Sequence, residues 1–257
     1  MVRRAPDMSG PALATSGLNK RFGSLVVANN IGIALPAGVR YALIGPNGAG
    51  KTTLINLMTG MLRPDGGQIL LDGEDITALG PEQRVRRGLV RTFQINSLFP
   101  HLTPLEAVTL TICERDKIAR TWWRRTADYR AAVDEAHAIL ESLMLGPVCT
   151  RETRHLAYGQ QRLLEIALAL ATKPKVLLLD EPAAGVPRDE SAELFTAINN
   201  LSKDITVLFI EHDMELVFRL ASRIIVMVSG GILLEGTPTE IAADPRVREV
   251  YLGGAHG

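Results

Sequence analysis

A glycine-rich stretch near residue 45 has the residue types and the spacing that hold the phosphates of a nucleotide. Its residues are Gly45, Pro46, Asn47, Gly48, Ala49, Gly50, Lys51, Thr52 and Thr53. Glycines let the backbone approach a phosphate closely, and the free amides of the loop and of a following helix point at the anion. The lysine places a cation at the β- and γ-phosphates, and the first threonine can ligate Mg²⁺. The stretch therefore predicts a phosphate-binding loop.

The flanking residues supply the strand and the helix that such a loop requires. Apolar residues at 39–44 predict a strand before it, and those at 54–62 have the spacing of a helix that buries one face. The alternative is a glycine-rich turn before an ordinary helix. An ordinary turn would seldom contain the full G-x-x-x-x-G-K-T pattern between a strand and a helix, so phosphate binding is favoured.

A second candidate site lies at the end of an aliphatic run. Four apolar residues at 176–179 precede Asp180 and Glu181. An uninterrupted run of this kind suits a parallel strand that is covered on both faces. Asp180 then stands at the carboxyl end of the strand, where open α/β sheets place their ligand sites. A solvated strand end is the alternative, and the phosphate loop in the same chain argues against it.

Composition limits the remaining classes of function. The chain has 257 residues, enough for one large α/β domain or for a core with a smaller helical insertion. Its 28 basic residues equal its 28 acidic ones, so the charge gives no indication of nucleic acid or of an anionic membrane surface as partner. Cys113 and Cys149 lack metal-ligand spacing, which predicts free thiols in a reducing compartment.

We expect a soluble cytoplasmic protein, so that any membrane role would have to come through a partner. Residues 1–11 read as a disordered tail without a secretory signal. The longest apolar run, near 163–171, contains Glu165 and is too short to cross a bilayer.

The predicted fold is α/β: a P-loop NTPase core with an N-terminal antiparallel β region and an inserted α-helical subdomain. Residues 13–35 alternate as antiparallel strands do. Helical patterns fill much of residues 95–171, beginning with a capping box at Thr103. The core then resumes with the strand that ends at Asp180 and a strand over 205–210.

The order of the motifs resembles the ATP-binding cassette (ABC) family, over essentially the whole chain from about residue 13. That order is the phosphate loop, a strand ending at Gln94, the loop 156–160, Asp180 with Glu181, and His212. The resemblance implies an ABC ATPase domain over residues 12–257, with the helical subdomain at about 95–171 inserted in the core. It also implies ATP and Mg²⁺ as cofactors.

The resemblance gives these residues roles. Asp180, Thr52 and Gln94 would hold Mg²⁺, directly or through water. Glu181 would act as general base on the attacking water, with Gln94 sensing that water and His212 contacting the γ-phosphate. The remaining residues expected at the nucleotide are Phe22, which would stack on adenine, and Val27, which would pack nearby.

The stretch Leu156–Gln160 resembles the family's signature loop. In the family, the helix that follows it caps the γ-phosphate bound to a second cassette, so two cassettes enclose two ATP molecules. Its phosphate-facing residues would be Ala157, Tyr158, Gly159 and Gln160. Two residues depart from the family pattern, since Ala157 replaces the usual serine and Pro187 replaces an aspartate or asparagine. We expect the first to weaken the phosphate contact by about 1–3 kcal/mol.

Within the family, the chain looks like the ATP-binding subunits of branched-chain (hydrophobic) amino acid importers. The segments that carry this likeness are 91–94, 98–103, 158–162, 181–185 and 249–253. Such a subunit lies on the cytoplasmic face of the membrane. Its partners are a second ATPase subunit, identical or different, two transmembrane permeases and, indirectly, a solute-binding protein. Related members transport amides, urea or aromatic acids, and others export lipids.

Two further classes of function require sequence features that this chain does not show. A cassette that acts on nucleic acid or ribosomes usually has two cassettes in one chain, a long coiled coil or a basic extension. A GTPase-type switch would need an N-K-x-D motif, and Asn19-Lys20 does not continue in that way.

Overall fold

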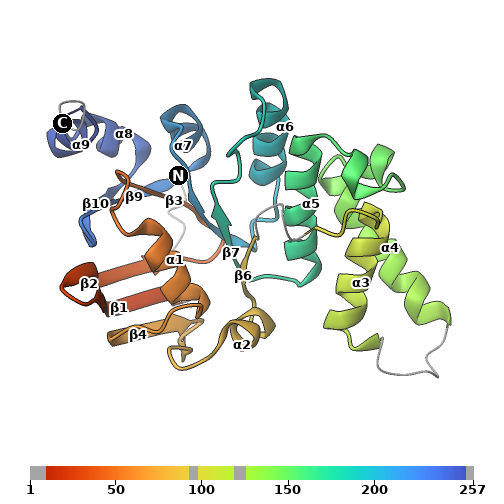
Figure 1. The fold of residues 1–257 in the computed structure, drawn as a ribbon, viewed down its shortest axis with the longest axis horizontal. Helices are drawn as coiled ribbons and strands as arrows, with labels where there is room; N and C mark the ends of the chain where they lie inside the picture. The colour runs from red at the N-terminus through yellow and green to blue at the C-terminus, as the bar shows by residue number, and fades with distance from the viewer. Residues whose placement is uncertain (1–9, 93–97, 119–125, 253–257) are drawn as a thin grey trace, which may run out of the picture.

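The first sheet is antiparallel and lies at one side of the molecule (Figure 1). The computed structural model describes residues 10–92, 98–118 and 126–252. In order β2-β1-β4-β5, the sheet contains β1 (Leu13–Phe22), β2 (Leu25–Leu35), β4 (Gly66–Leu71) and β5 (Glu74–Asp75). Leu13 pairs with Leu35 on one side and with Leu71 on the other, and Leu13 and Leu35 are fully buried. This confirms the predicted N-terminal antiparallel region.

The second sheet has six strands in the order β10-β9-β3-β8-β7-β6. They are β3 (Arg40–Ile44), β6 (Leu89–Arg91), β7 (Val176–Asp180), β8 (Thr206–Ile210), β9 (Arg223–Val228) and β10 (Gly231–Gly236). All neighbours pair in parallel except β9 and β10. The carboxyl ends of β3, β6, β7 and β8 therefore meet at one edge of the sheet.

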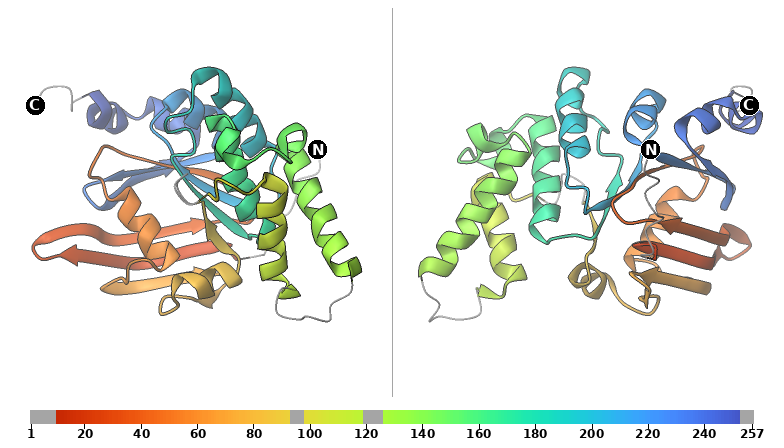
Figure 2. Two further views of the ribbon diagram at one scale, coloured as in Figure 1. Left: turned by 45° about the vertical axis from the view of Figure 1, so that its right-hand side comes forward. Right: turned by 180° about the vertical axis from the view of Figure 1, so that it is seen from behind.

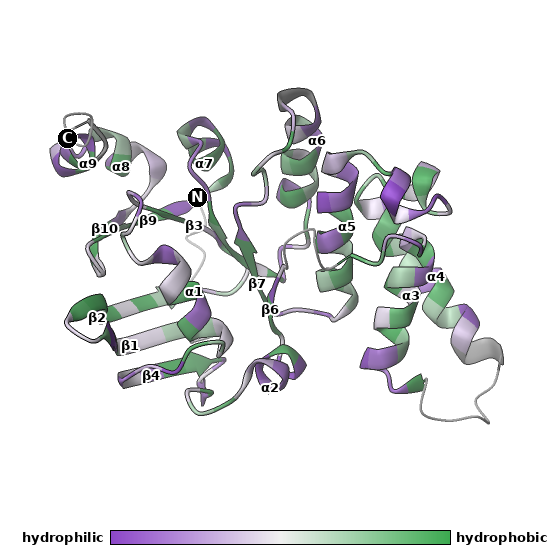
Figure 3. Cartoon of the chain, viewed as in Figure 1, coloured by the Kyte–Doolittle hydropathy of each residue, from purple (hydrophilic) through white to green (hydrophobic). Residues whose placement is uncertain are grey.

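Both faces of this sheet are buried. Val176 and Leu178 of β7 pack into the cluster shared with the antiparallel sheet, whereas Leu177 and Leu179 pack into the opposite cluster. Strand β7 is hydrophobic along the sheet interior (Figure 3). The aliphatic run before Asp180 is thus the doubly covered parallel strand that its composition predicts.

Helices cover the two faces. The helix after the phosphate loop, α1 (Lys51–Thr59), packs between the sheets, while α3 and α4 extend on the far side (Figures 1 and 2). The others are α2 (Pro81–Arg86), α3 (Pro104–Arg115), α4 (Thr126–Ser142), α5 (Tyr158–Ala171), α6 (Arg188–Asn199), α7 (Met214–Leu220), α8 (Pro238–Ala243) and α9 (Pro245–Leu252). No helix in the described ranges is long and apolar enough to cross a membrane.

Helix α3 begins at the residue that its capping sequence predicts. Thr103 accepts from the Glu106 amide and Glu106 accepts from the Thr103 amide, so the predicted capping box is present. Helices α3, α4 and α5 lie within residues 95–171, with two short 3-10 helices, Gly146–Val148 and Thr153–His155, between α4 and α5. The expected disordered tail falls mainly on residues 1–9, outside the described ranges.

Arg84 has an environment that its residue type does not suggest. Its side chain is 1% exposed and donates to the carbonyl oxygens of Leu57, Met58, Thr77 and Leu79. The first two belong to the last turn of α1, where a cation stabilises unpaired carbonyl groups and complements the helix dipole. Arg84 thus anchors the carboxyl end of the helix whose amino end forms the phosphate loop.

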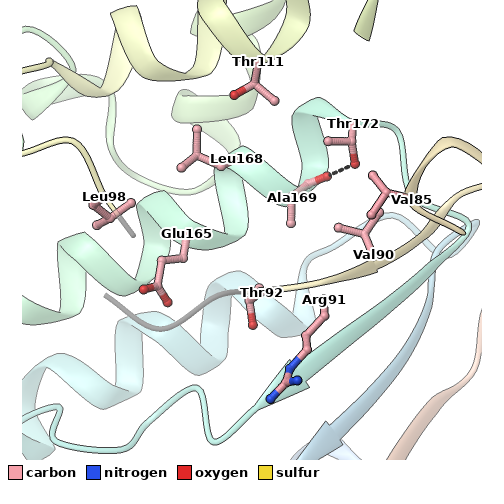
Figure 4. A pocket seen from close by; sticks show the side chains of 10 residues that line it. All are labelled: Val85, Val90, Arg91, Thr92, Leu98, Thr111, Glu165, Leu168, Ala169 and Thr172. Atoms are coloured by element: carbon pink, nitrogen blue, oxygen red, sulfur yellow. Dashed lines mark hydrogen bonds between the residues drawn. The ribbon is translucent and has the colours of Figure 1, made fainter. Parts of the chain in front are cut away.

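A cavity of 210 Å³ lies between β6 and α5 (Figure 4). Val85, Val90 and Leu168 give it an apolar wall, and Glu165 reaches it from α5. Glu165 is 6% exposed. One of its oxygens accepts from Arg162 Nη1 at 3.0 Å, and the other has no partner among the described residues. Burial raises the pKa of Glu165 to about 7, although the Arg162 guanidinium opposes this shift.

Replacing Glu165 by glutamine should stabilise the protein more at about pH 8 than at about pH 5. The folded protein holds this proton more tightly than the unfolded chain, so the free energy of unfolding falls as pH rises from 4.5 to about 7. The variant has no such proton, and its advantage should grow over that window by at most about 3 kcal/mol. Thermal unfolding at both pH values measures this. Glu193→Gln, at an exposed position on α6, is the control. An advantage of Glu165→Gln that does not change with pH would contradict the prediction.

Candidate nucleotide-binding site

The glycine-rich loop joins β3 to α1 and is closely enclosed by the backbone of other segments. Gly50 has φ of 100°, and a Cβ there would come within 2.5 Å of the Val27 carbonyl oxygen. A Cβ at Gly45 would come within 2.1 Å of the Met227 carbonyl oxygen. Both positions therefore require glycine for space. Asn47 and Gly48 form the exposed rim of the loop.

Lys51 is a nearly buried cation at the start of α1. Its side chain is 7% exposed, and Nζ donates to the carbonyl oxygens of Gly45 at 2.7 Å and Pro46 at 3.1 Å. Burial lowers its pKa, and the charges of Glu181 and Asp180 oppose this shift. Lys51 forms no ion pair within the described residues. A buried ammonium held only by carbonyl groups, beside the helix amino end, suits a polyphosphate anion.

Asp180 ends β7, as expected, and is held by an arginine. Its Oδ2 accepts from Arg91 Nη2 at 2.5 Å, and Arg91 Nη1 donates to Asn56 Oδ1 at 2.7 Å. Both charged side chains are about four-fifths buried, with exposures of 21% for Arg91 and 18% for Asp180. Arg91 belongs to the segment 91–94 that carries the likeness to branched-chain amino acid importers, but the sequence alone did not indicate a role for it.

The structure brings Glu181 and His212 together. They follow the neighbouring strands β7 and β8, and Glu181 Oε1 lies 2.8 Å from His212 Nε2. Both side chains are half-exposed, at 44% and 48%. Glu181 has φ of 50°, in the left-handed region that costs a non-glycine residue energy. A carboxylate held on an imidazole at a solvent-facing strand end can orient a water molecule and accept its proton.

Glu211, which sequence reasoning did not select, supports this arrangement. It is 6% exposed, and its carboxylate accepts from the amides of Ala183 and His212. Burial raises its pKa, and these two hydrogen bonds oppose the shift. Glu211 thereby connects the turn that contains Ala183 to His212, the residue that pairs with Glu181. The only feature of the sequence that could have indicated a role for Glu211 is its position directly after the apolar strand β8.

Phe22 and Val27 flank the turn of the β1–β2 hairpin. The Phe22 ring is 52% exposed, with Lys20 Nζ 5.7 Å from its centroid. The Val27 carbonyl group touches the position of Gly50, so Val27 borders the phosphate loop. An exposed ring on this hairpin is compatible with stacking on a base, which stays a prediction.

The loop at residues 156–160 opens α5. Ala157 stands at the N-cap without a side-chain hydrogen bond, and its own amide donates to Gln160 Oε1 at 3.1 Å. The Gly159 amide donates to Glu190 Oε2 of the same chain at 2.7 Å. Arg162 in the next turn lies 5.5 Å from the Tyr158 ring and donates to the Ala184 carbonyl oxygen at 3.4 Å. The loop is therefore attached to the segment that follows β7.

The structure thus gathers most of the predicted residues, in two groups. The phosphate loop, Asp180, Glu181 and His212 lie at the carboxyl edge of the second sheet, whereas residues 157–160 begin α5, which packs on α3, α4 and α6. Gln94 lies outside the described residues. Sequence reasoning missed Arg91, Glu190 and Glu211 as partners of the site.

Comparison with known proteins identifies the group to which this architecture belongs. The family model described as ABC transporter matches residues 28–184, and the one described as branched-chain amino acid ATP-binding cassette transporter matches residues 232–257.

Curated relatives match nearly end to end. The branched-chain amino acid transport ATP-binding protein BraF of Pseudomonas aeruginosa is 40% identical over 96% of this chain and 100% of its own length. LivG of Escherichia coli K12, named likewise, is 41% identical with the same coverage.

Solved structures agree with the sequence matches. The ADP conformation of MJ1267, an ATP-binding cassette of an ABC transporter, superposes with a TM-score of 0.81 at 34% identity, covering 94% of this chain and 98% of that one. A nucleotide-free cassette from an ABC transporter gives 0.80 at 33% identity, covering 93% and 98%. The phosphate loop, the acidic strand end and these matches together place the chain in the ABC transporter family, as an ATP-binding cassette.

Proposed function

We propose that this chain is the ATP-hydrolysing subunit of an importer for branched-chain or related hydrophobic amino acids. The observation that carries the proposal is the meeting of Lys51, Asp180 and the Glu181–His212 pair at one sheet edge, in a chain 40% identical to BraF over nearly its whole length. The names of the relatives support the solute class.

The chain's own groups suit ATP hydrolysis. We assign the phosphates to the loop amides and Lys51, and the adenine to Phe22 with Val27 nearby. Glu181, oriented by His212, would accept a proton from the attacking water, and His212 would face the γ-phosphate.

Thr52 and Asp180 are the described residues assigned to Mg²⁺, with Gln94 as a further one. Bound there, Mg²⁺ would neutralise the phosphate charge. The described residues contain no group of three or more His, Cys, Asp or Glu side chains that could hold a metal alone. Two protein oxygens plus phosphate oxygens and water suit Mg²⁺, which keeps several non-protein ligands.

Residues 157–160 would complete the site of a second cassette, identical or different. The amides at the start of α5 favour an anion. Ala157 supplies no hydroxyl group, so the backbone amides of Tyr158, Gly159 and Gln160 would carry that contact.

Two permeases would supply the membrane-spanning part, with the cassette at their cytoplasmic face and a solute-binding protein acting outside. A groove of 810 Å³ between α2, α3 and α5 suits a permease segment. Phe99 and Leu110 on its wall are 66% and 56% exposed, and Glu114, Arg115 and Lys117 add charges at its border. Exposed apolar side chains beside a polar border are typical of a protein contact.

Replacing Leu110 by glutamate should abolish recovery of the permeases. A charge in the apolar groove would be costly to bury on docking. The measurement is affinity purification of the tagged chain from native membranes, with nucleotide binding checked separately. Met144→Glu, at an exposed position outside the groove, is the control and should recover two permeases and a second cassette. Recovery of ribosomes or DNA instead would overturn the proposal.

Replacing Glu181 by glutamine should lower the rate of ATP hydrolysis by roughly 10²–10⁴-fold, because an amide cannot accept the proton. ATP affinity should change little, since the phosphate loop is untouched. Phosphate release in the assembled complex and binding of a fluorescent ATP analogue separate the two effects. Glu193→Gln serves as the control, and normal turnover of Glu181→Gln would contradict the assignment.

Replacing Lys51 by alanine should weaken ATP binding by at least about tenfold, the order of effect of losing one charge-assisted hydrogen bond. Folding should be retained because Lys51 makes no ion pair within the described residues. Nucleotide titration and thermal unfolding measure the two quantities. Unchanged affinity would count against the role of the loop.

A further inference from the structure

Arg91 links two elements that carry proposed ligands of Mg²⁺. It is the last residue of β6, and its guanidinium bonds Asp180 of β7 and Asn56 of α1. Its side chain lines the cavity at Glu165, and its guanidinium group points toward the carboxyl end of β7 (Figure 4). Neither acceptor is close to Arg91 in sequence, at separations of 35 and 89 residues. The bridge therefore belongs to the tertiary structure.

Asn56 lies in the same helix as Thr52, a proposed ligand of Mg²⁺. Asn56 follows Thr52 by four residues in α1, so the two side chains share one face of the helix. Arg91 thus connects the Thr52 face of α1 to the carboxylate of Asp180. Because Arg91 bonds Oδ2, and Oδ1 has no hydrogen bond within the described residues, one carboxylate oxygen remains available.

We propose that Arg91 is a positioning residue that fixes the separation and orientation of Thr52 and Asp180 for the nucleotide-bound Mg²⁺. The inference rests on the proposed nucleotide site. Mg²⁺ demands near-ideal octahedral geometry, so small shifts of a ligand weaken its binding. A planar guanidinium can donate to two acceptors at once in a fixed geometry, which a lysine ammonium on a flexible chain does not reproduce.

The alternative role of Arg91 is to neutralise Asp180. The two roles predict opposite results, because loss of a neighbouring positive charge would strengthen the attraction between Asp180 and Mg²⁺. Arg91→Lys retains the charge without the two-point bridge, whereas Arg91→Gln loses both. Asn56→Ala removes one anchor of the bridge and leaves both charges in place.

The test is the affinity of the full chain for a fluorescent ADP analogue, measured with Mg²⁺ and with EDTA. For the unaltered chain, Mg²⁺ should tighten binding. If Mg²⁺ does not tighten binding to the unaltered chain, the proposed magnesium site is wrong. If Mg²⁺ tightens binding to the unaltered chain and equally to the variants, only the inference about Arg91 is wrong.

We expect Arg91→Lys and Arg91→Gln to reduce the tightening by Mg²⁺ at least about fivefold, which is less than the full effect of losing one charge-assisted hydrogen bond. Asn56→Ala should act in the same direction but less strongly. Affinity in EDTA should be unchanged, which shows that the loop is folded. Arg86→Gln, at an exposed ion pair on α2, is the control. Undiminished tightening in Arg91→Lys and Asn56→Ala, or stronger tightening in Arg91→Gln, would overturn the proposal.

Discussion

Both faces of the six-stranded sheet are buried, and the rest of the structure depends on this constraint. Alternate residues of β7 enter two separate hydrophobic clusters, so no polar side chain fits along the strand without a partner. Polar groups are confined to the strand ends. Because β3, β7 and β8 run in parallel, their carboxyl ends bring the phosphate loop, the acidic pair and His212 to one edge. Three segments far apart in sequence are thereby combined into one site.

The parts of the fold and site that could be predicted depend on local patterns. The glycine loop, the aliphatic run before Asp180 and the capping box at Thr103 each depend on residues close in sequence, and the structure contains all three. The parts that could not be predicted are pairings over long separations. Residue type alone places Arg84 at the surface, yet it is buried because it meets carbonyl groups of α1, 26 and 27 residues earlier.

The same reason explains the partners missed around the site. Arg91 finds Asp180 across 89 residues, and Glu211 finds the Ala183 amide across 28. No periodicity or spacing encodes such pairs. Gln94 lies outside the described residues, and the roles of all the predicted site residues, including the stacking of Phe22 on adenine, stay predictions. Pro187 stands at the N-cap of α6 and makes no side-chain hydrogen bond there, so the carboxylate or amide usual at this position has no substitute from its own side chain.

The hydrogen bond from the Gly159 amide to Glu190 has a consequence for assembly. The fold holds the Glu190 carboxylate beside the amino end of α5, so its local concentration does not change with the supply of nucleotide. In the proposed pairing, a phosphate bound to another subunit would have to displace the Glu190 carboxylate to reach this amide. Under the proposed pairing, Glu190 would therefore oppose the contact between α5 and the phosphate of a second cassette.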